Sequence, residues 1–292
     1  MKRAAAASVS VATLLLATKL AAWLVTGSVA ILSSLIDSLL DVAASAINLV
    51  AVRHALVPAD AEHRFGHGKA EAIAGLMQAT IVAASALFLV YQAVQRLIVP
   101  QNLQHTGIGI AVMLGAIVLT AALIVYQSRV VRRTGSLAIA ADSVHFRSDL
   151  LTNLGVIAAL VLSTMFDLPR ADAIIALMIA AYVGLSAWKI WLRSIDNIMD
   201  RELPDDERGR IRDIVLAHPE AMGIHDLRTR SSGSNSFIQF HVEVATSCSL
   251  VEAHRISDEI EDAVSTAFPD AEVIIHADPY GIQEQRLDFG KA

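Results

Sequence analysis

Apolar residues are distributed unevenly along this chain of 292 residues. Long apolar runs fill the sequence up to about residue 195, and only short polar segments separate them. A helix needs about 20 residues to cross the hydrocarbon core of a membrane. Six runs reach this length, and we expect each to be a spanning helix: 4–26, 29–57, 70–99, 107–131, 136–165 and 171–195. The connections between them are expected at 27–28, 58–69, 100–105, 132–135 and 167–170.

The pattern changes after residue 195. Helical spacing of apolar positions is found at 204–217 and 250–268, and alternation typical of strands is found at 225–230, 237–244 and 272–276. The order αββαβ predicts a small α+β sandwich. The chain is therefore expected to be a membrane all-α six-helix bundle over 1–200, followed by a small α+β cytoplasmic domain over 201–292.

Basic residues indicate the orientation in the membrane. They gather at the N-terminus and in two of the connections, and the opposite connections offer only Arg96 and Arg170. The gathered residues are Lys2, Arg3, Arg53, Arg64, Lys69, Arg129, Arg132 and Arg133. By the positive-inside rule both termini are expected in the cytoplasm, with the chain as a multi-pass membrane protein.

Composition narrows the class further. Hydrophobic residues make up 54% of the chain, more than in an average soluble domain. The formal net charge of −6 argues against a nucleic-acid partner. The single cysteine, Cys248, cannot form a disulfide within the chain, so nothing requires an oxidising compartment.

Two pairs of ionisable residues lie inside the predicted spans. Asp37 and Asp41 are four residues apart, as are His145 and Asp149, so each pair shares one helix face. An isolated charge at mid-membrane costs about 2.5–3.5 kcal/mol on insertion scales, and a shared divalent cation removes most of that cost. Three carboxylates and an imidazole suit a tetrahedral zinc-like site. The alternative is a set of structural polar contacts near helix ends.

Further polar residues follow these pairs at helical spacing. Ser34, Ser45 and Asn48 accompany the first pair. Asp142, Thr152 and Asn153 accompany the second. We expect a polar stripe on each helix, facing the other; the alternative is that small polar residues only mediate helix packing.

The connection 58–69 contains a second candidate set. Asp60, His63 and His67 could close on one ion, with Glu62 as an alternative to Asp60. Polar loops often hold histidines, so this pattern is a weak indication when taken alone.

Half of the ten histidines lie in the C-terminal domain. His276 and Asp278 are spaced to share one side of a strand. We expect a metal-binding cluster in this domain formed by His225, His241, His254, His276 and Asp278. The alternative is a set of ordinary surface histidines.

Together these motifs resemble the cation diffusion facilitator family, close to its bacterial zinc/iron-efflux branch of ferrous-iron efflux pump-like proteins. The resemblance is carried by Asp37-x3-Asp41 with His145-x3-Asp149, by Phe-Gly-His-Gly-Lys-Ala-Glu at 65–71, by His-Asp-Leu-Arg-Thr-Arg at 225–230, and by Ile-Ile-His-Ala-Asp-Pro at 274–279. It covers nearly the whole chain. One departure is Ala61, where relatives carry a second aspartate, so the acidic loop ligand stays open between Asp60 and Glu62.

The resemblance implies a homodimer that exports metal against an influx of protons. It implies a transport site in the spans, an interfacial site in the loop, and a two-metal site between metallochaperone-like cytoplasmic domains. It also implies a charge interlock between Lys69 and Asp200 near the membrane surface. Zinc is the expected ion for transport and for regulation, with iron, cadmium, cobalt and manganese as alternative substrates.

Two other functions are possible from these residues. An intramembrane metallohydrolase would use the bound metal to activate water, but the sequence has no His-Glu-x-x-His and no Gly-x-Ser-x-Gly. A metal sensor would bind the ion without moving it. The chain is therefore expected to be a transporter and not an enzyme, and imidazole ligands disfavour magnesium as its cargo.

Overall fold

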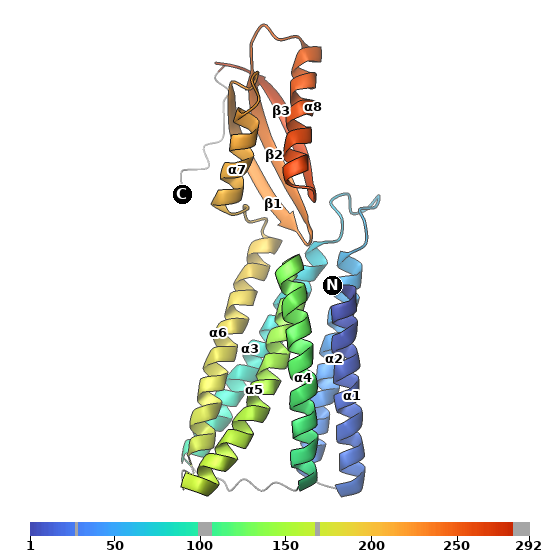
Figure 1. Cartoon of the computed structure of the whole chain (residues 1–292), viewed down its shortest axis with the longest axis vertical. Helices are drawn as coiled ribbons and strands as arrows, with labels where there is room; N and C mark the ends of the chain where they lie inside the picture. Colours follow the sequence, from blue (N-terminus) through green and yellow to red (C-terminus); the bar gives the residue numbers. More distant parts are fainter. Residues whose placement is uncertain (27–28, 99–106, 167–169, 283–292) are drawn as a thin grey trace. The chain divides into compact units, whose positions relative to one another are not determined.

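The computed structural model describes residues 1–26, 29–98, 107–166 and 170–282 (Figure 1). The predicted connections at 27–28 and 100–105, and residues 167–169 of the predicted connection at 167–170, lie outside the described residues. The chain divides into two compact units, Met1–Ile198 and Met199–Ala292, and each is described by itself.

The first unit is a bundle of long helices (Figure 1). Its helices are α1 (Lys2–Thr26), α2 (Val29–Ala55), α3 (Lys69–Ile98), α4 (Gly107–Thr134), α5 (Leu137–Phe166) and α6 (Ala171–Ile198), and each end lies within one turn of its predicted position. Among the described residues, five helices are long and apolar enough to cross a membrane; α5, which carries Asp142, Arg147 and Asp149, is not among the five. The prediction of a helical membrane domain is confirmed.

Small residues allow these helices to approach closely. The buried contact between α3, α5 and α6 is built largely from alanine and valine, including Ala79, Ala86 and Ala187. Within a membrane, helix association depends on such packing because lipid removes the hydrophobic driving force. Gly155 of α5 shows how close the approach is, since an added Cβ would lie 2.8 Å from a methyl carbon of Ile179 on α6.

The second unit is the predicted α+β domain, with the order αββαβ. It contains α7 (Asp205–Leu216), β1 (Gly223–Ser232), β2 (Asn235–Val244), α8 (Leu250–Ala267) and β3 (Ala271–Pro279). The strands have the order β1-β2-β3, with β1 antiparallel and β3 parallel to β2. Both strands of the hairpin are longer than predicted, because a tight turn with Gly233 at φ 64° leaves Ser232 and Asn235 paired.

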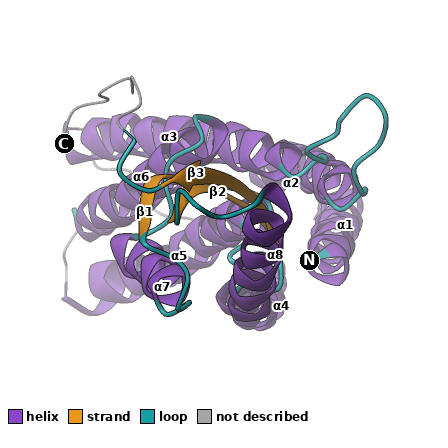
Figure 2. Cartoon of the chain, turned by 90° about the horizontal axis from the view of Figure 1, so that it is seen from above, coloured by secondary structure: helices purple, strands orange, loops and turns teal. Residues whose placement is uncertain are grey.

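Both helices cover the same face of the sheet (Figure 2). Ile211 of α7 and Ile256 and Ile260 of α8 pack against even-numbered residues of β2, such as Ile238 and Phe240. Because side chains alternate along a strand, the odd-numbered residues of β2, including His241, lie on the opposite face. The side of the sheet without helices is therefore where the histidines of this unit can meet.

Candidate functional site

An acidic and imidazole cluster lies inside the helical bundle. His145 Nε2 of α5 is 2.9 Å from Asp41 Oδ1 of α2 and 3.7 Å from Asp149 Oδ2, one turn further along α5. Ligand atoms of all three residues lie within 4.8 Å of one another. His145 is buried, whereas Asp41 and Asp149 are half-buried, so a cation held by these atoms would lie between two helices. Two carboxylates and one imidazole are ligands that a transition-metal ion accepts.

Asp37, the fourth predicted ligand, is near this cluster but not part of it. It lies one turn before Asp41 on α2 and is exposed in the single chain. The converging set among the described residues is Asp41, His145 and Asp149. For Asp37 to join it, its side chain has to turn toward Asp41 when an ion is bound.

The predicted polar stripes are present but do not all face each other. Ser45 and Asn48 of α2 are buried, and Asn48 Nδ2 donates to the Ala138 carbonyl of α5 at 3.4 Å. Asp142, however, accepts a hydrogen bond from Gln127 Nε2 of α4 at 2.7 Å. The same amide nitrogen donates to Ser8 Oγ of α1 at 2.9 Å. Asp142 therefore connects α5 to α4 and α1, a relation that helical spacing alone did not indicate.

The loop between α2 and α3 brings its three candidate ligands together. Asp60 Oδ1 is 3.4 Å from His63 Nδ1, and Asp60 Oδ2 is 3.4 Å from His67 Nε2. The other ring nitrogen of His67, Nδ1, lies 3.4 Å from the Val57 carbonyl oxygen. Glu62, the alternative acid, is exposed and outside this group.

Backbone N–H groups of the loop stabilise the charged form of the Asp60 carboxylate. Its carboxylate accepts the N–H groups of His63 at 2.6 Å and Glu62 at 2.9 Å. The hydrogen bond from His63 is the main cause that holds the pKa of Asp60 below its ordinary value, because it stabilises the charged form. A further histidine, His54 at the end of α2, places its ring 4.6 Å from that of His67, centre to centre; we did not select it from the sequence.

The third cluster lies on the open face of the sheet. His225, His241 and His276 occupy matched positions on β1, β2 and β3, so their imidazoles form a row across the sheet. Buried Asp278 contacts all three: its Oδ2 is 2.7 Å from His241 Nδ1 and 3.2 Å from His225 Nε2, and its Oδ1 is 3.0 Å from His276 Nε2. One buried carboxylate thus gathers three imidazoles.

His254 does not join this row within one chain. It lies on α8, which covers the other face of the sheet, and its Nδ1 is 3.4 Å from Asp258 one turn along the same helix. Asp226 was not selected from the sequence, yet its Oδ2 is 3.9 Å from His241 Nε2. Asp226 has φ 47° and lies at an irregularity in the pairing of β1 with β2, which turns its side chain toward the histidines.

The two residues of the predicted charge interlock each have a contact within their own unit. Lys69 Nζ donates to the Ile198 carbonyl at 3.2 Å, and Asp200 Oδ2 lies 3.5 Å from Arg230 Nη1. The pairing of Lys69 with Asp200 would join the two units and stays a prediction.

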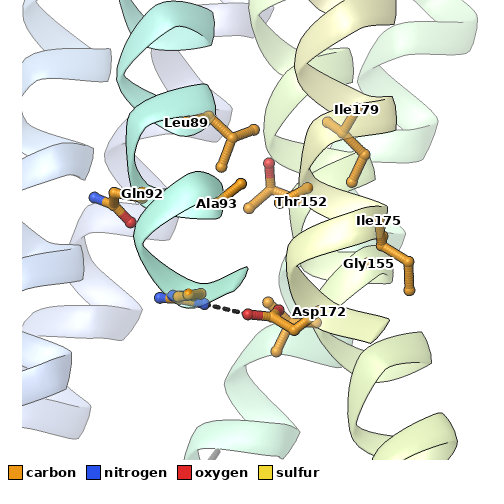
Figure 3. A pocket seen from close by; sticks show the side chains of 11 residues that line it. Leu89, Gln92, Ala93, Thr152, Gly155, Asp172, Ile175 and Ile179 are labelled. Atoms are coloured by element: carbon orange, nitrogen blue, oxygen red, sulfur yellow. Dashed lines mark hydrogen bonds and ion pairs between the residues drawn. The ribbon is translucent and has the colours of Figure 1, made fainter. Parts of the chain in front are cut away.

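A cavity of about 120 Å³ lies between α3, α5 and α6 (Figure 3). Its wall is mostly apolar, with Gln92, Thr152 and the ion pair of Arg96 and Asp172 as polar members. Arg96 Nη1 and Asp172 Oδ2 are 2.5 Å apart and connect the last turn of α3 to the first turn of α6. Thr152, which lines the cavity, is one turn beyond Asp149 on α5.

Long apolar helices that enclose carboxylates and an imidazole define an integral membrane protein of the cation-transporting class. Residues 5–199 match the family described as the cation efflux transmembrane domain, and residues 203–280 match the cytoplasmic domain of cation efflux proteins. The chain belongs to the cation efflux family, as its resemblance to the cation diffusion facilitators predicted, and it is a cation efflux transporter for divalent metals.

Two bacterial cation-efflux pumps support this assignment. The chain is 48% identical over 282 residues to the cation-efflux pump FieF of Cronobacter sakazakii, covering 97% of this chain and 94% of that one. It is 47% identical to FieF of Klebsiella pneumoniae, again over 97% of this chain and 94% of that one. A solved structure of CzrB in a zinc form is 39% identical, with a TM-score of 0.28, and covers 30% of this chain and 99% of that one.

Proposed function

We propose that this protein exports zinc from the cytoplasm in exchange for protons. The observation that carries the proposal is the convergence of Asp41 with His145 and Asp149 from two helices of the membrane domain. A site made by two helices can change its exposure when they move relative to each other. Zinc suits the set because it accepts imidazole and carboxylate ligands in tetrahedral coordination.

Asp37 completes the proposed transport site as a fourth ligand. It is one turn from Asp41 on α2, so a change of side-chain rotamer brings its carboxylate toward the ion. The ions of the loop and of the cytoplasmic domain are regulatory in this proposal, because both clusters lie outside the spans. His254, which is apart from the row of histidines in one chain, would be supplied by the second subunit of a homodimer.

Orientation and coupling follow from the same residues. In this proposal both termini lie on the cytoplasmic side of a bacterial inner membrane, which the basic residues of the N-terminus and of two connections support. Zinc requires a neutral imidazole, so protons and metal compete for His145. A proton that enters from the more acidic side can therefore take the place of the released ion. Membrane residues 1–200 would carry transport, and residues 201–292 would carry regulation.

Zinc uptake into proteoliposomes tests this proposal, with the cytoplasmic face outward and with or without a pH gradient. We expect uptake to increase when the vesicle interior is acidic and to fall when a protonophore removes the gradient. Zinc binding without any uptake would instead indicate a sensor. The same vesicles distinguish iron, cadmium, cobalt and manganese, because competition by each ion reports its own affinity. Release of peptide or ester products would indicate a hydrolase.

A further inference from the structure

Lys19 is a charged residue inside the apolar part of α1. Leucines at positions 14–16 and 20 flank it along the helix. Its ammonium donates to Ser38 Oγ of α2 at 2.6 Å and lies 3.3 Å from the Ser34 carbonyl. An ionisable residue within a membrane helix is costly and commonly marks an ion pathway.

The acceptor of Lys19 belongs to the part of α2 that carries the acidic pair. Ser38 is buried and lies between Asp37 and Asp41 in the sequence. The ammonium also interacts electrostatically with the carboxylates of Asp37 and Asp149, which belong to two different helices. The hydrogen bonds of Lys19 thus hold a positive charge beside the cluster. They are made to a serine hydroxyl and a backbone carbonyl, and not to a candidate metal ligand.

We propose that Lys19 is a resident counter-cation of the transport site and sets how tightly the site holds its metal. Without metal, its positive charge offsets part of the repulsion among the carboxylates. With a divalent ion bound, the same charge repels the ion, and in the interior of a protein such repulsion acts over several ångströms. A transporter must bind its ion firmly enough to take it up and weakly enough to release it. Lys19 shifts that balance toward release.

This inference rests on the proposed transport site and differs from a purely structural role. If Lys19 only connected α1 to α2, then the hydrogen bond to Ser38 would matter and the charge would not. Lys19→Gln retains a donor and removes the charge, and Lys19→Met removes both. Lys19→Arg retains the positive charge. The charge and the hydrogen bond can therefore be separated with three variants.

The experiment uses the full chain in detergent, with the other clusters disabled by His63→Ala, His67→Ala, His225→Ala and His241→Ala. Zinc affinity is measured by calorimetry at about pH 8, above the ordinary pKa of histidine near 6.5, to limit competition by protons. We expect Lys19→Gln and Lys19→Met to bind zinc about tenfold more tightly, and Lys19→Arg to stay within about threefold of its parent. Turnover in vesicles at saturating zinc should fall in both neutral variants.

Asp41→Ala in the same background separates the two proposals. If it abolishes zinc binding while Lys19→Gln binds zinc like the parent, then the role of Lys19 is overturned and the transport site stands. If Asp41→Ala binds zinc like the parent, the transport site itself is wrong. Equal weakening in Lys19→Gln and Lys19→Met would also overturn the counter-cation role. Gel filtration checks that each variant is folded. If Lys19→Met is not folded, the zinc affinity of Lys19→Gln alone tests the role of the charge.

Discussion

His145 Nε2 of α5 lies 2.9 Å from Asp41 Oδ1 of α2, so the candidate transport site is shared between two helices. Neither helix holds the complete set alone. A relative movement of α2 and α5 would separate the carboxylate from the imidazole and release a bound ion. A change in the distance between these two residues would therefore change how firmly the candidate site holds a cation.

Replacing Asp41 with Asn should abolish most zinc transport without unfolding the chain. The amide has the shape of the carboxylate but lacks its charge. Loss of a residue that hydrogen-bonds to a metal ligand typically lowers metal affinity or activity by about 10–100-fold. Loss of a direct ligand should therefore lower zinc flux by about 100-fold or more. Asp142→Asn is the matched comparison, because Asp142 is buried on α5 and accepts from Gln127 of α4. Zinc flux in Asp142→Asn should fall less than tenfold. Equal losses of zinc flux in the two variants would argue against a special role for Asp41.

Asp60→Asn should weaken zinc binding in the loop while preserving the loop conformation. The amide oxygen can still accept the N–H groups of His63 and Glu62. We expect affinity to fall about tenfold or more, measured by calorimetry in a chain whose other two clusters are disabled. Glu62→Gln is the control and should change affinity little, because Glu62 is outside the converging group. The opposite result would identify Glu62 as the ligand.

The pH dependence of loop binding should not come from Asp60. Its pKa is lowered, mainly by the His63 N–H, so its charged form is present above its ordinary pKa of about 3.9 and is lost only when pH falls through the lowered value. Between pH 7 and about pH 5, loss of zinc from this loop must then follow protonation of other groups. Infrared titration of the carboxylate, with Asp60→Asn as the reference, checks this; a carboxylate signal lost near pH 5 would contradict it.

Zinc should stabilise the cytoplasmic unit through Asp278. This buried carboxylate contacts three imidazoles, and free zinc at about 100 times the dissociation constant adds about 2.7 kcal/mol to the free energy of unfolding. Chelation should therefore lower the unfolding temperature of this unit in the full chain. Asp278→Asn should remove the response to zinc, and the exposed Asp258→Asn on α8 should keep it. A retained response in the first variant would place the metal elsewhere.

Regular spacing made much of the fold and part of the site predictable. The pair His145 and Asp149 shares a face because both lie on one helix, and the pair His276 and Asp278 shares one side of β3 because side chains alternate along a strand. Asp226 was missed because its position depends on an irregularity in strand pairing, which no periodicity reveals.

Contacts between helices were the least predictable part. The bond from Gln127 to Asp142 and the approach of His54 to His67 depend on how separate elements pack, and spacing within one element does not contain that information. Lys19 differs from these cases, because a lysine inside an apolar span is visible in the sequence. That signal could have directed attention to the first helix.

Arg96 and Asp172 should stabilise the membrane unit as a pair. Their atoms approach to 2.5 Å, and the side chains are 37% and 16% exposed, so the pair is intermediate between an exposed and a buried ion pair (Figure 3). Removing one partner leaves the other charge beside a mostly apolar cavity. We expect Asp172→Asn or Arg96→Met to lower the free energy of unfolding by about 1–3 kcal/mol, between the values for exposed and for buried pairs.

The reversed double variant, Arg96→Asp with Asp172→Arg, should recover at least half of that loss, because the attraction between α3 and α6 is restored. Thermal unfolding in detergent measures all four chains, and a double variant as unstable as the sum of the single ones would show that the two residues are not coupled.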